Sequence, residues 1–269
     1  MSAADFPLAH ALSGTNPIVN DYDPIATIFD EVMGFDFHNA TYALRRTIAE
    51  RVLAGTPMHC LDLCCGTGLF LFELSKDFPI YGQGIDLSAG QIKVAQNRLS
   101  EQTHIRLRCE NVLIARFPGN VDFVTINMDA LNHLPTESWP ELFKKVSNSL
   151  SEHGGLLFDY NLPERLAADW NAPEVIPKDH MVYIQLADEP VIVGNTITRR
   201  TPQIMFMRNE HGSFDRYDAT VEHSSMPLKD TLQALHDAGL SRTEVIACEG
   251  STPNGHLFNK NRAYILAQH

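Results

Sequence analysis

The sequence predicts an α/β protein built on a doubly wound, mostly parallel sheet of seven strands. Between residues 54 and 162, short apolar runs alternate with segments of helical periodicity, the spacing of strand–helix–strand units with right-handed crossovers. A glycine-rich turn follows the first apolar run, and an acidic residue ends the second. With 269 residues and 44% hydrophobic content, the chain is large enough for one sizeable domain with additions.

Residues 1–53 are expected to form an N-terminal helical lid. Residues 1–20 show little pattern, whereas apolar residues recur at helical spacing from Tyr22 to Leu53. Gly34 is expected to separate two helices, and the turn at residues 55–57 is expected to precede the first strand.

The core is predicted over residues 54–162 and 226–269. Its seven strands are expected at residues 59–64, 80–86, 104–110, 121–127, 155–160, 242–248 and 261–267. Its helices are expected at residues 69–76, 88–100, 136–150 and 228–238. Ser88 and Gln91 are spaced as a capping box at the start of the second of these helices. Gly239 is a typical residue to follow the last of them.

Residues 163–225 are predicted to be an inserted antiparallel sheet. Short segments rich in β-branched and aromatic residues occur at 181–187, 191–199, 202–208 and 214–225. Turn-forming residues at 188–190 and 209–212 separate some of these segments.

Composition argues against several classes of partner. The formal net charge is −12 and no basic stripe occurs, so phosphate-mediated binding of nucleic acid is disfavoured. No apolar run approaches a membrane span, and the N-terminus lacks the pattern of a secretion signal, so we expect a cytoplasmic protein without membrane contact. The five cysteines are interpreted as reduced, mostly buried thiols, with a metal site as the weaker alternative. We predict no metal.

The segment from Cys60 to Gly68 has the order of a buried strand, a glycine turn and the start of a helix. Glycine at positions 66 and 68 allows the backbone to approach a ligand closely. The helix that follows directs its free N–H groups toward the same place. Asp86, at the end of the second strand, is placed to accept hydrogen bonds from two ribose hydroxyls. This layout predicts a site for an adenosine-containing cofactor.

Two residues bear on which cofactor is bound. A nicotinamide dinucleotide fingerprint requires glycine where this chain has Leu71, so that fingerprint is incomplete. Asp62 lies within the apolar strand, where a carboxylate is costly unless it is paired. The α-amino group of S-adenosylmethionine is a suitable partner. A nicotinamide cofactor, or a glycine turn without any ligand, is the alternative.

Leu-Asp-Leu-Cys-Cys-Gly-Thr-Gly at 61–68, together with Gly-Ile-Asp-Leu-Ser at 84–88, resembles the first two motifs of class I S-adenosylmethionine-dependent methyltransferases. The order of parts is similar to that of small-molecule enzymes of this class: a helical lid, a Rossmann-like core, an antiparallel insertion and a terminal hairpin. A weaker likeness to sugar-amine N-methyltransferases spans most of the chain.

The resemblance implies S-adenosyl-L-methionine as cofactor and a set of residues around it. Gly66 and Gly68 are expected to approach its carboxylate and sugar, and Leu87 to cover the adenine. An acid often follows the third strand in the family; here Asn111, or alternatively Glu110, takes that place. The full expected set is Asp62, Cys64, Gly66, Gly68, Asp86, Leu87, Asn111, Val112, Asn127 and Met128.

Methyl transfer from a sulfonium requires alignment and exclusion of water, and a base only if the nucleophile arrives protonated. After the fourth strand, Asp129 and His133 are titratable. His133 falls on the histidine of the sugar N-methyltransferases and is our candidate base, with a helix-capping or solvated histidine as the alternative. Asp129 departs from the subgroup and is expected to hold an amine or orient His133. This segment lacks the Asn/Asp-Pro-Pro-Tyr/Phe pattern of enzymes that methylate nucleic-acid bases.

Four further positions are candidates near the acceptor. Tyr22 and Phe29 on the lid are expected to close over cofactor and substrate, although core packing is an equal alternative for Phe29. Tyr160, at the exit of the fifth strand, is expected to line the substrate pocket. His223 follows Glu222 in a pattern similar to the subgroup and is a candidate substrate contact.

The function predicted is methyl transfer to an amine or hydroxyl of a small molecule. One alternative is an S-adenosylmethionine-binding enzyme with other chemistry, such as cyclisation or rearrangement. Another is a non-catalytic binding protein that interacts through the inserted sheet. A protein or peptide acceptor is also open, and likeness to the subgroup suggests a homodimer.

Overall fold

The computed structural model describes residues 22–52, 58–168, 173–247 and 261–269. The turn predicted at residues 55–57 therefore lies outside the described residues, as do residues 1–20 and Cys248. The other four cysteines, Cys60, Cys64, Cys65 and Cys109, are free thiols. Cys109 is exposed, unlike the buried pair Cys60 and Cys65, because its strand lies at the edge of the sheet.

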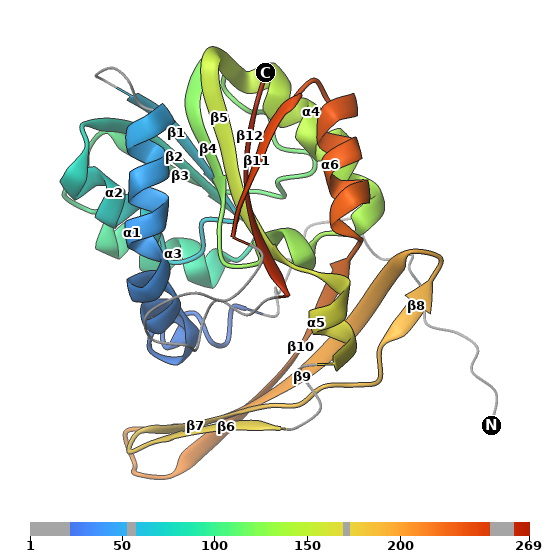
Figure 1. The fold of residues 1–269 in the computed structure, drawn as a ribbon. Helices are drawn as coiled ribbons and strands as arrows, with labels where there is room; N and C mark the ends of the chain where they lie inside the picture. Colours follow the sequence, from blue (N-terminus) through green and yellow to red (C-terminus); the bar gives the residue numbers. More distant parts are fainter. Residues whose placement is uncertain (1–21, 53–57, 169–172, 248–260) are drawn as a thin grey trace.

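Seven strands form the main sheet in the order β11-β12-β5-β4-β1-β2-β3. Their bounds are β1 Met58–Leu63, β2 Ile80–Asp86, β3 Ile105–Cys109, β4 Val121–Ile126, β5 Leu150–Asn161, β11 Arg242–Ala247 and β12 Arg262–Gln268. The strands β1 to β5 pair in parallel, and β12 runs antiparallel to both β5 and β11. The predicted seven-stranded, mostly parallel sheet is confirmed (Figure 1).

Helices cover both faces of this sheet, and each face has its own apolar core (Figure 1). One core packs beneath α1 (Phe35–Val52), α2 (Leu69–Asp77) and α3 (Ala89–Arg98). The other packs beneath α4 (Trp139–Ser149) and α6 (Leu228–Asp237). Ser88 caps α3 by accepting a hydrogen bond from the Gln91 N–H at 3.1 Å, as its capping pattern predicts.

Two helix boundaries differ from the sequence prediction. Gly34 does not separate two helices, because the π-helical turn η1 (Asp30–Gly34) continues directly into α1. The Phe35 N–H donates to the Asp30 carbonyl, and Phe35 stays in the right-handed helical region. The helix predicted at 136–150 is shorter, because a 3-10 turn, η3 (Thr136–Ser138), precedes α4 and β5 begins at Leu150. Another 3-10 turn, η2 (Ala130–His133), follows β4.

The inserted antiparallel sheet has the order β10-β9-β7-β6, with β8 paired to β9. Its strands are β6 Glu174–Lys178, β7 Met181–Gln185, β8 Val191–Val193, β9 Thr196–Arg208 and β10 Phe214–Ser225. Sequence patterns missed β6 and the short helix α5 (Pro163–Ala168) that precedes it. The break expected near residue 200 occurs instead at Gly194, whose φ of +59° forms the β8–β9 turn. Pro202 stays within β9, and its carbonyl accepts the Leu186 N–H at 2.8 Å.

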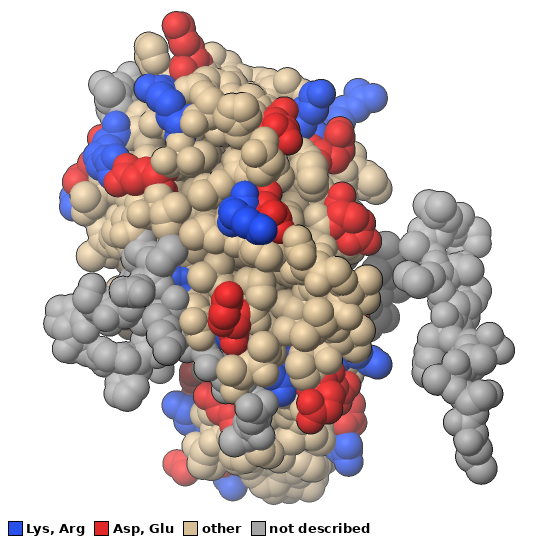
Figure 2. All heavy atoms as spheres, turned by 45° about the vertical axis from the view of Figure 1, so that its right-hand side comes forward, with Lys and Arg blue, Asp and Glu red and all other residues tan. Residues whose placement is uncertain are grey.

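The N-terminal segment joins the two sheets. Ile25 and Ile28 pack in one apolar cluster with Met181, Tyr183 and Met205 of the inserted sheet. The inserted sheet crosses below the main sheet, with the N-terminal segment beside it (Figure 1). Lys and Arg side chains are interspersed with acidic ones on the face shown in Figure 2. No helix in the described ranges has the length and apolar character needed to span a bilayer.

Candidate active site

A cavity of about 560 Å³ lies among the carboxyl ends of β1, β2 and β4, the N-terminal segment and the inserted sheet. Ligands of open α/β sheets bind at the carboxyl ends of the strands, at the point where the strand order reverses. In this sheet that point lies between β1 and β4. Eleven of the residues predicted from the sequence line this cavity: Tyr22, Asp62, Cys64, Gly66, Asp86, Leu87, Asn127, Met128, Asp129, His133 and His223. Phe29 lines it as well.

The two glycines of the turn have different roles. Gly66 lines the cavity with φ at +53°, and its N–H donates to Asp86 Oδ2 at 2.8 Å. Gly68 has φ at +70° but does not line the cavity. A Cβ at Gly68 would lie 2.9 Å from Leu99 Cδ1 and 3.1 Å from Ala95 Cβ, so this glycine allows α3 to pack against the turn.

Asp86 ends β2 and is held by backbone groups. Its Oδ2 accepts from Gly66 N, and its Oδ1 accepts from Ser88 N at 2.8 Å. Burial raises the pKa of Asp86, against the lowering effect of these two N–H donors. The carboxylate is therefore fixed at the cavity wall, where the sequence places an acceptor for ribose hydroxyls.

Asp62 is a buried carboxylate, 2% exposed, on the cavity wall. Thr125 Oγ1 donates to its Oδ1 at 2.6 Å and Asn127 Nδ2 donates to the same atom at 3.0 Å. Burial raises the pKa of Asp62 to about 7 in spite of these donors. A cationic group in the cavity would favour the ionised form.

Arg45 provides a positive charge near Asp62 that the sequence analysis missed. It comes from α1, is 2% exposed, and lines the cavity. Its guanidinium lies 4.8 Å from the centre of the Phe70 ring, and Nη2 lies 3.2 Å from His38 Nδ1. Burial, with a further contribution from Arg45, lowers the pKa of His38 to about 3, so this histidine is neutral. Asp62 and Arg45 together offer opposite charges to a zwitterionic ligand end.

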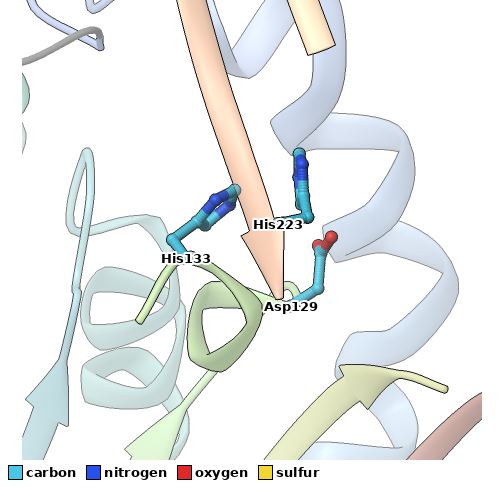
Figure 3. A group of neighbouring side chains, drawn as sticks. All are labelled: Asp129, His133 and His223. Atoms are coloured by element: carbon cyan, nitrogen blue, oxygen red, sulfur yellow. The ribbon is translucent and has the colours of Figure 1, made fainter. Parts of the chain in front are cut away.

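Two histidines that line the cavity lie beside each other (Figure 3). His133 comes from η2 and His223 from β10, and their ring centres lie 4.4 Å apart. His133 Nδ1 lies 3.3 Å from the Glu222 carbonyl, and Nε2 lies 3.1 Å from the Tyr22 hydroxyl. Because a carbonyl only accepts, this contact places the proton on Nδ1 and leaves Nε2 as the acceptor.

Burial keeps both histidines neutral. Burial lowers the pKa of His133, partly offset by Asp129. Burial also lowers the pKa of His223 to about 3, helped by its histidine neighbour. Burial acts to raise the pKa of Asp129, but Arg262 and smaller contributions from other basic neighbours together outweigh it, and the pKa is lowered.

Asp129 belongs to a buried ionic network. Arg262 Nη2 donates to its Oδ1 at 2.9 Å, and Asn161 Nδ2 donates to its Oδ2 at 2.7 Å. Arg262 also pairs with Asp159 at 2.5 Å. The ligand atoms of Asp129, His133 and His223 lie within 4.8 Å of one another, close enough for a metal ion, but the guanidinium on Asp129 opposes a cation there.

Comparison with known proteins finds a methyltransferase domain in this chain. Residues 60–154 match the family model described as a methyltransferase domain. The chain carries a methyltransferase domain, and its seven-stranded fold matches that of class I S-adenosylmethionine-dependent methyltransferases. YqeM of Bacillus subtilis (strain 168), whose name assigns it to the methyltransferases, is 27% identical over 248 residues, which cover 89% of this chain and 96% of YqeM.

Two solved structures share the fold of this methyltransferase. An S-adenosylmethionine-dependent methyltransferase from Clostridium acetobutylicum ATCC 824 is 22% identical, with a TM-score of 0.70, and the match covers 93% of this chain and 99% of that one. The sugar N-methyltransferase KedS8 from Streptoalloteichus sp ATCC 53650 is 17% identical, with a TM-score of 0.67, over 100% of this chain and 98% of that one.

The cavity of the methyltransferase suits S-adenosylmethionine, its cofactor. Asp62 and Arg45 present charges for the amino and carboxylate groups, and Asp86 presents a carboxylate for the ribose. Gln91, 2% exposed, lines the cavity with an Oε1 that accepts no hydrogen bond from the described residues. A Cβ at Gly66 would meet only this oxygen, at 3.8 Å, which leaves the turn open on its cavity side.

Two acidic residues of the N-terminal segment, Asp30 and Asp23, bind the turns that follow β1 and β2. No local sequence signal predicts these contacts. Thr67 Oγ1 donates to Asp30 Oδ1 at 2.7 Å, and Arg98 forms an ion pair with Asp30. Asp23 Oδ1 accepts from Ser88 Oγ at 2.5 Å. The N-terminal segment, which also lines the cavity, is thereby attached to the core.

The structure does not bring every predicted residue to the cavity. Asn111 Oδ1 accepts the Leu113 N–H at 2.9 Å within its own turn. Val112 is buried in the core beneath α4. Tyr160 is fully buried and packs edge-on against Trp139, with ring centres 5.4 Å apart. Along with Gly68 and Glu110, these residues are not among those that line the cavity.

Proposed function

We propose that this methyltransferase transfers a methyl group to an amine or hydroxyl of a small molecule, with His133 accepting the proton of the acceptor. The observation that carries the proposal is that His133, whose Nε2 is left as an acceptor, lines the same cavity as Asp62 and Asp86. The fold shared with a sugar N-methyltransferase supports an amine acceptor.

S-adenosylmethionine, when bound, supplies a methyl group already activated for displacement. The protein's part is alignment, exclusion of water and proton acceptance. Tyr22 and the Glu222 carbonyl hold the His133 ring from both of its nitrogens. The lowered pKa of His133 keeps the imidazole neutral near pH 7. Nε2 can then accept a proton from an ammonium or hydroxyl group that takes the place of the Tyr22 hydroxyl at this nitrogen.

Asp129 acts in this proposal through charge and position. Its carboxylate is held by Arg262 and Asn161, and it raises the pKa of His133 against the effect of burial. A proton accepted by His133 would thus be stabilised by a nearby fixed negative charge. His223, in contact with His133, is placed to touch the acceptor.

The test is substitution of His133 by glutamine, which keeps a polar side chain but cannot take up the proton. We expect kcat to fall about 100-fold or more, while the Kd for S-adenosylhomocysteine stays unchanged. The readout is mass-spectrometric detection of methylated product over a panel of amines, amino sugars and phenols.

The matched control is His236→Gln, on the exposed surface of α6. It should leave both quantities unchanged. Full kcat in His133→Gln at every pH would refute the role of His133, and no methylated product from any acceptor would refute the proposed function. A homodimer and a cytoplasmic location stay predictions from the sequence.

A further inference from the structure

Three polar side chains form a row across neighbouring strands of the inserted sheet. Glu174 of β6 pairs with Gln185 of β7, and Gln185 pairs with Gln203 of β9. Residues paired directly across strands project from the same face of a sheet. All three line the cavity that His133 and His223 also line. The row is therefore part of the cavity wall that the inserted sheet contributes.

Gln203 is the member of the row that needs a partner. Its side chain is 2% exposed, yet its Oε1 accepts no hydrogen bond from the described residues. A buried amide oxygen without a donor is unfavourable, and such groups in native proteins are normally paired. Since Gln203 lines the cavity, a donor that enters the cavity can reach this part of the wall.

The two neighbours of Gln203 add complementary groups. Gln185 Oε1 accepts from the Tyr183 hydroxyl at 3.0 Å, which orients its amide and leaves Nε2 as a donor. Glu174 is exposed and places a carboxylate at the mouth of the cavity. The row therefore contains acceptors on Gln203 and Glu174 and amide donors on Gln185 and Gln203.

The row lies apart from the reacting centre. His223 pairs with Arg199, which precedes Gln203 by four residues on β9. At ~3.3 Å of rise per residue, the row is about 13 Å along the strand from the level of His223. The even spacing keeps both levels on the same face. The row is thus placed to contact a part of the acceptor remote from its methylated atom.

We propose that Gln203, with Gln185 and Glu174, forms a specificity subsite for acceptors that carry a hydroxyl or ammonium donor remote from the methylated atom. This inference rests on the proposed function. An acceptor with an apolar distal end would leave Gln203 Oε1 unpaired in the complex and would bind less tightly.

The experiment uses binding, so it does not depend on turnover. Linear amino alcohols of six to ten carbons, each paired with the alkylamine of the same length, are titrated into the S-adenosylhomocysteine-saturated protein. The members of each pair differ only by the terminal hydroxyl. We expect at least one amino alcohol to bind about 10-fold tighter than its partner.

Gln203→Met keeps the size of the side chain and removes its amide, and it should abolish this difference. Gln96→Met, on the exposed face of α3, is the matched control and should retain it. Glu174→Gln, at an exposed position that folding tolerates, should weaken amino alcohol binding by a smaller factor and serves if Gln203→Met misfolds. The S-adenosylhomocysteine Kd should be equal in all variants.

The subsite would be overturned by equal affinity within every pair or by absence of binding by every amino alcohol. A preference that persists in both Gln203→Met and Glu174→Gln would also overturn it. Failure of the proposed function is separate, because it is read from the absence of methylated product. A hydroxyl preference without product would support the subsite and refute the methyl transfer.

Discussion

The two walls of the cavity are built in different ways. On the cofactor wall, Asp62, Gly66 and Asp86 come from two consecutive strand ends, and the Asp86 carboxylate is held by backbone N–H donors. On the acceptor wall, His133 and His223 are 90 residues apart in the chain, and their neutral rings meet only through the fold. The cofactor wall is a local structure, whereas the acceptor wall exists only when the inserted sheet is docked.

The largest change in cofactor affinity is expected from Asp86→Ala. The substitution removes the acceptor of two backbone N–H groups and of the ribose hydroxyls, interactions worth about 1.5–3 kcal/mol each. We expect the Kd for S-adenosylhomocysteine to rise by about 100-fold or more, measured by calorimetry. Asp237→Ala, on the surface of α6, is the control. NADH should bind neither protein, and unchanged thioether binding in Asp86→Ala would place the ribose elsewhere.

A smaller effect should appear in the pH dependence of cofactor affinity. The pKa of Asp62 is about 7 without a ligand, and pairing with an ammonium group lowers it. Binding below pH 7 must therefore release a proton, so affinity rises with pH and levels off above about 7, by up to about 10-fold per unit. Calorimetry in buffers of different ionisation enthalpy measures the released proton. In Asp62→Asn the proton release should vanish; if it persists, another group carries the coupling.

The smallest expected effect is on the acceptor wall, in Tyr22→Phe. This change removes one hydrogen bond to His133 Nε2 and keeps the ring that packs edge-on against Phe29. We expect kcat to fall by about 2- to 10-fold, the value of one hydrogen bond. The S-adenosylhomocysteine Kd should not change. A rise in that Kd comparable to the fall in kcat would show that Tyr22 serves the cofactor wall instead.

The difference between the two walls also explains which parts of the site could be predicted from the sequence. The strand ends and the glycine turn are local, so residue type and spacing predict Asp62, Gly66 and Asp86, and all three line the cavity. Arg45 was missed because an arginine within a helical segment has no local signal, and its burial depends on packing against Phe70.

Other differences have equally specific causes. The positive φ of Gly68 suits a ligand-facing turn, but the space beside its Cα is occupied by Ala95 of α3 and by Leu99 at the end of that helix. Tyr160 lies at the correct sheet edge, but it packs against Trp139 of α4 in the core rather than at the cavity. Gln203 occupies an alternating strand pattern in which no residue type marks the cavity face.

The turn between β9 and β10 affects the position of His223 in the cavity. Asn209 Oδ1 accepts from the backbone N–H groups of His211 and Ser213, which shapes this surface turn. The turn sets which residues of the two strands face each other, and a slip by one residue would turn every side chain of β10 to the opposite face. His223 would then leave the cavity, and the carbonyl that selects the His133 tautomer would shift with it. The tautomer of His133 thus depends on the strand register that a solvent-exposed turn sets.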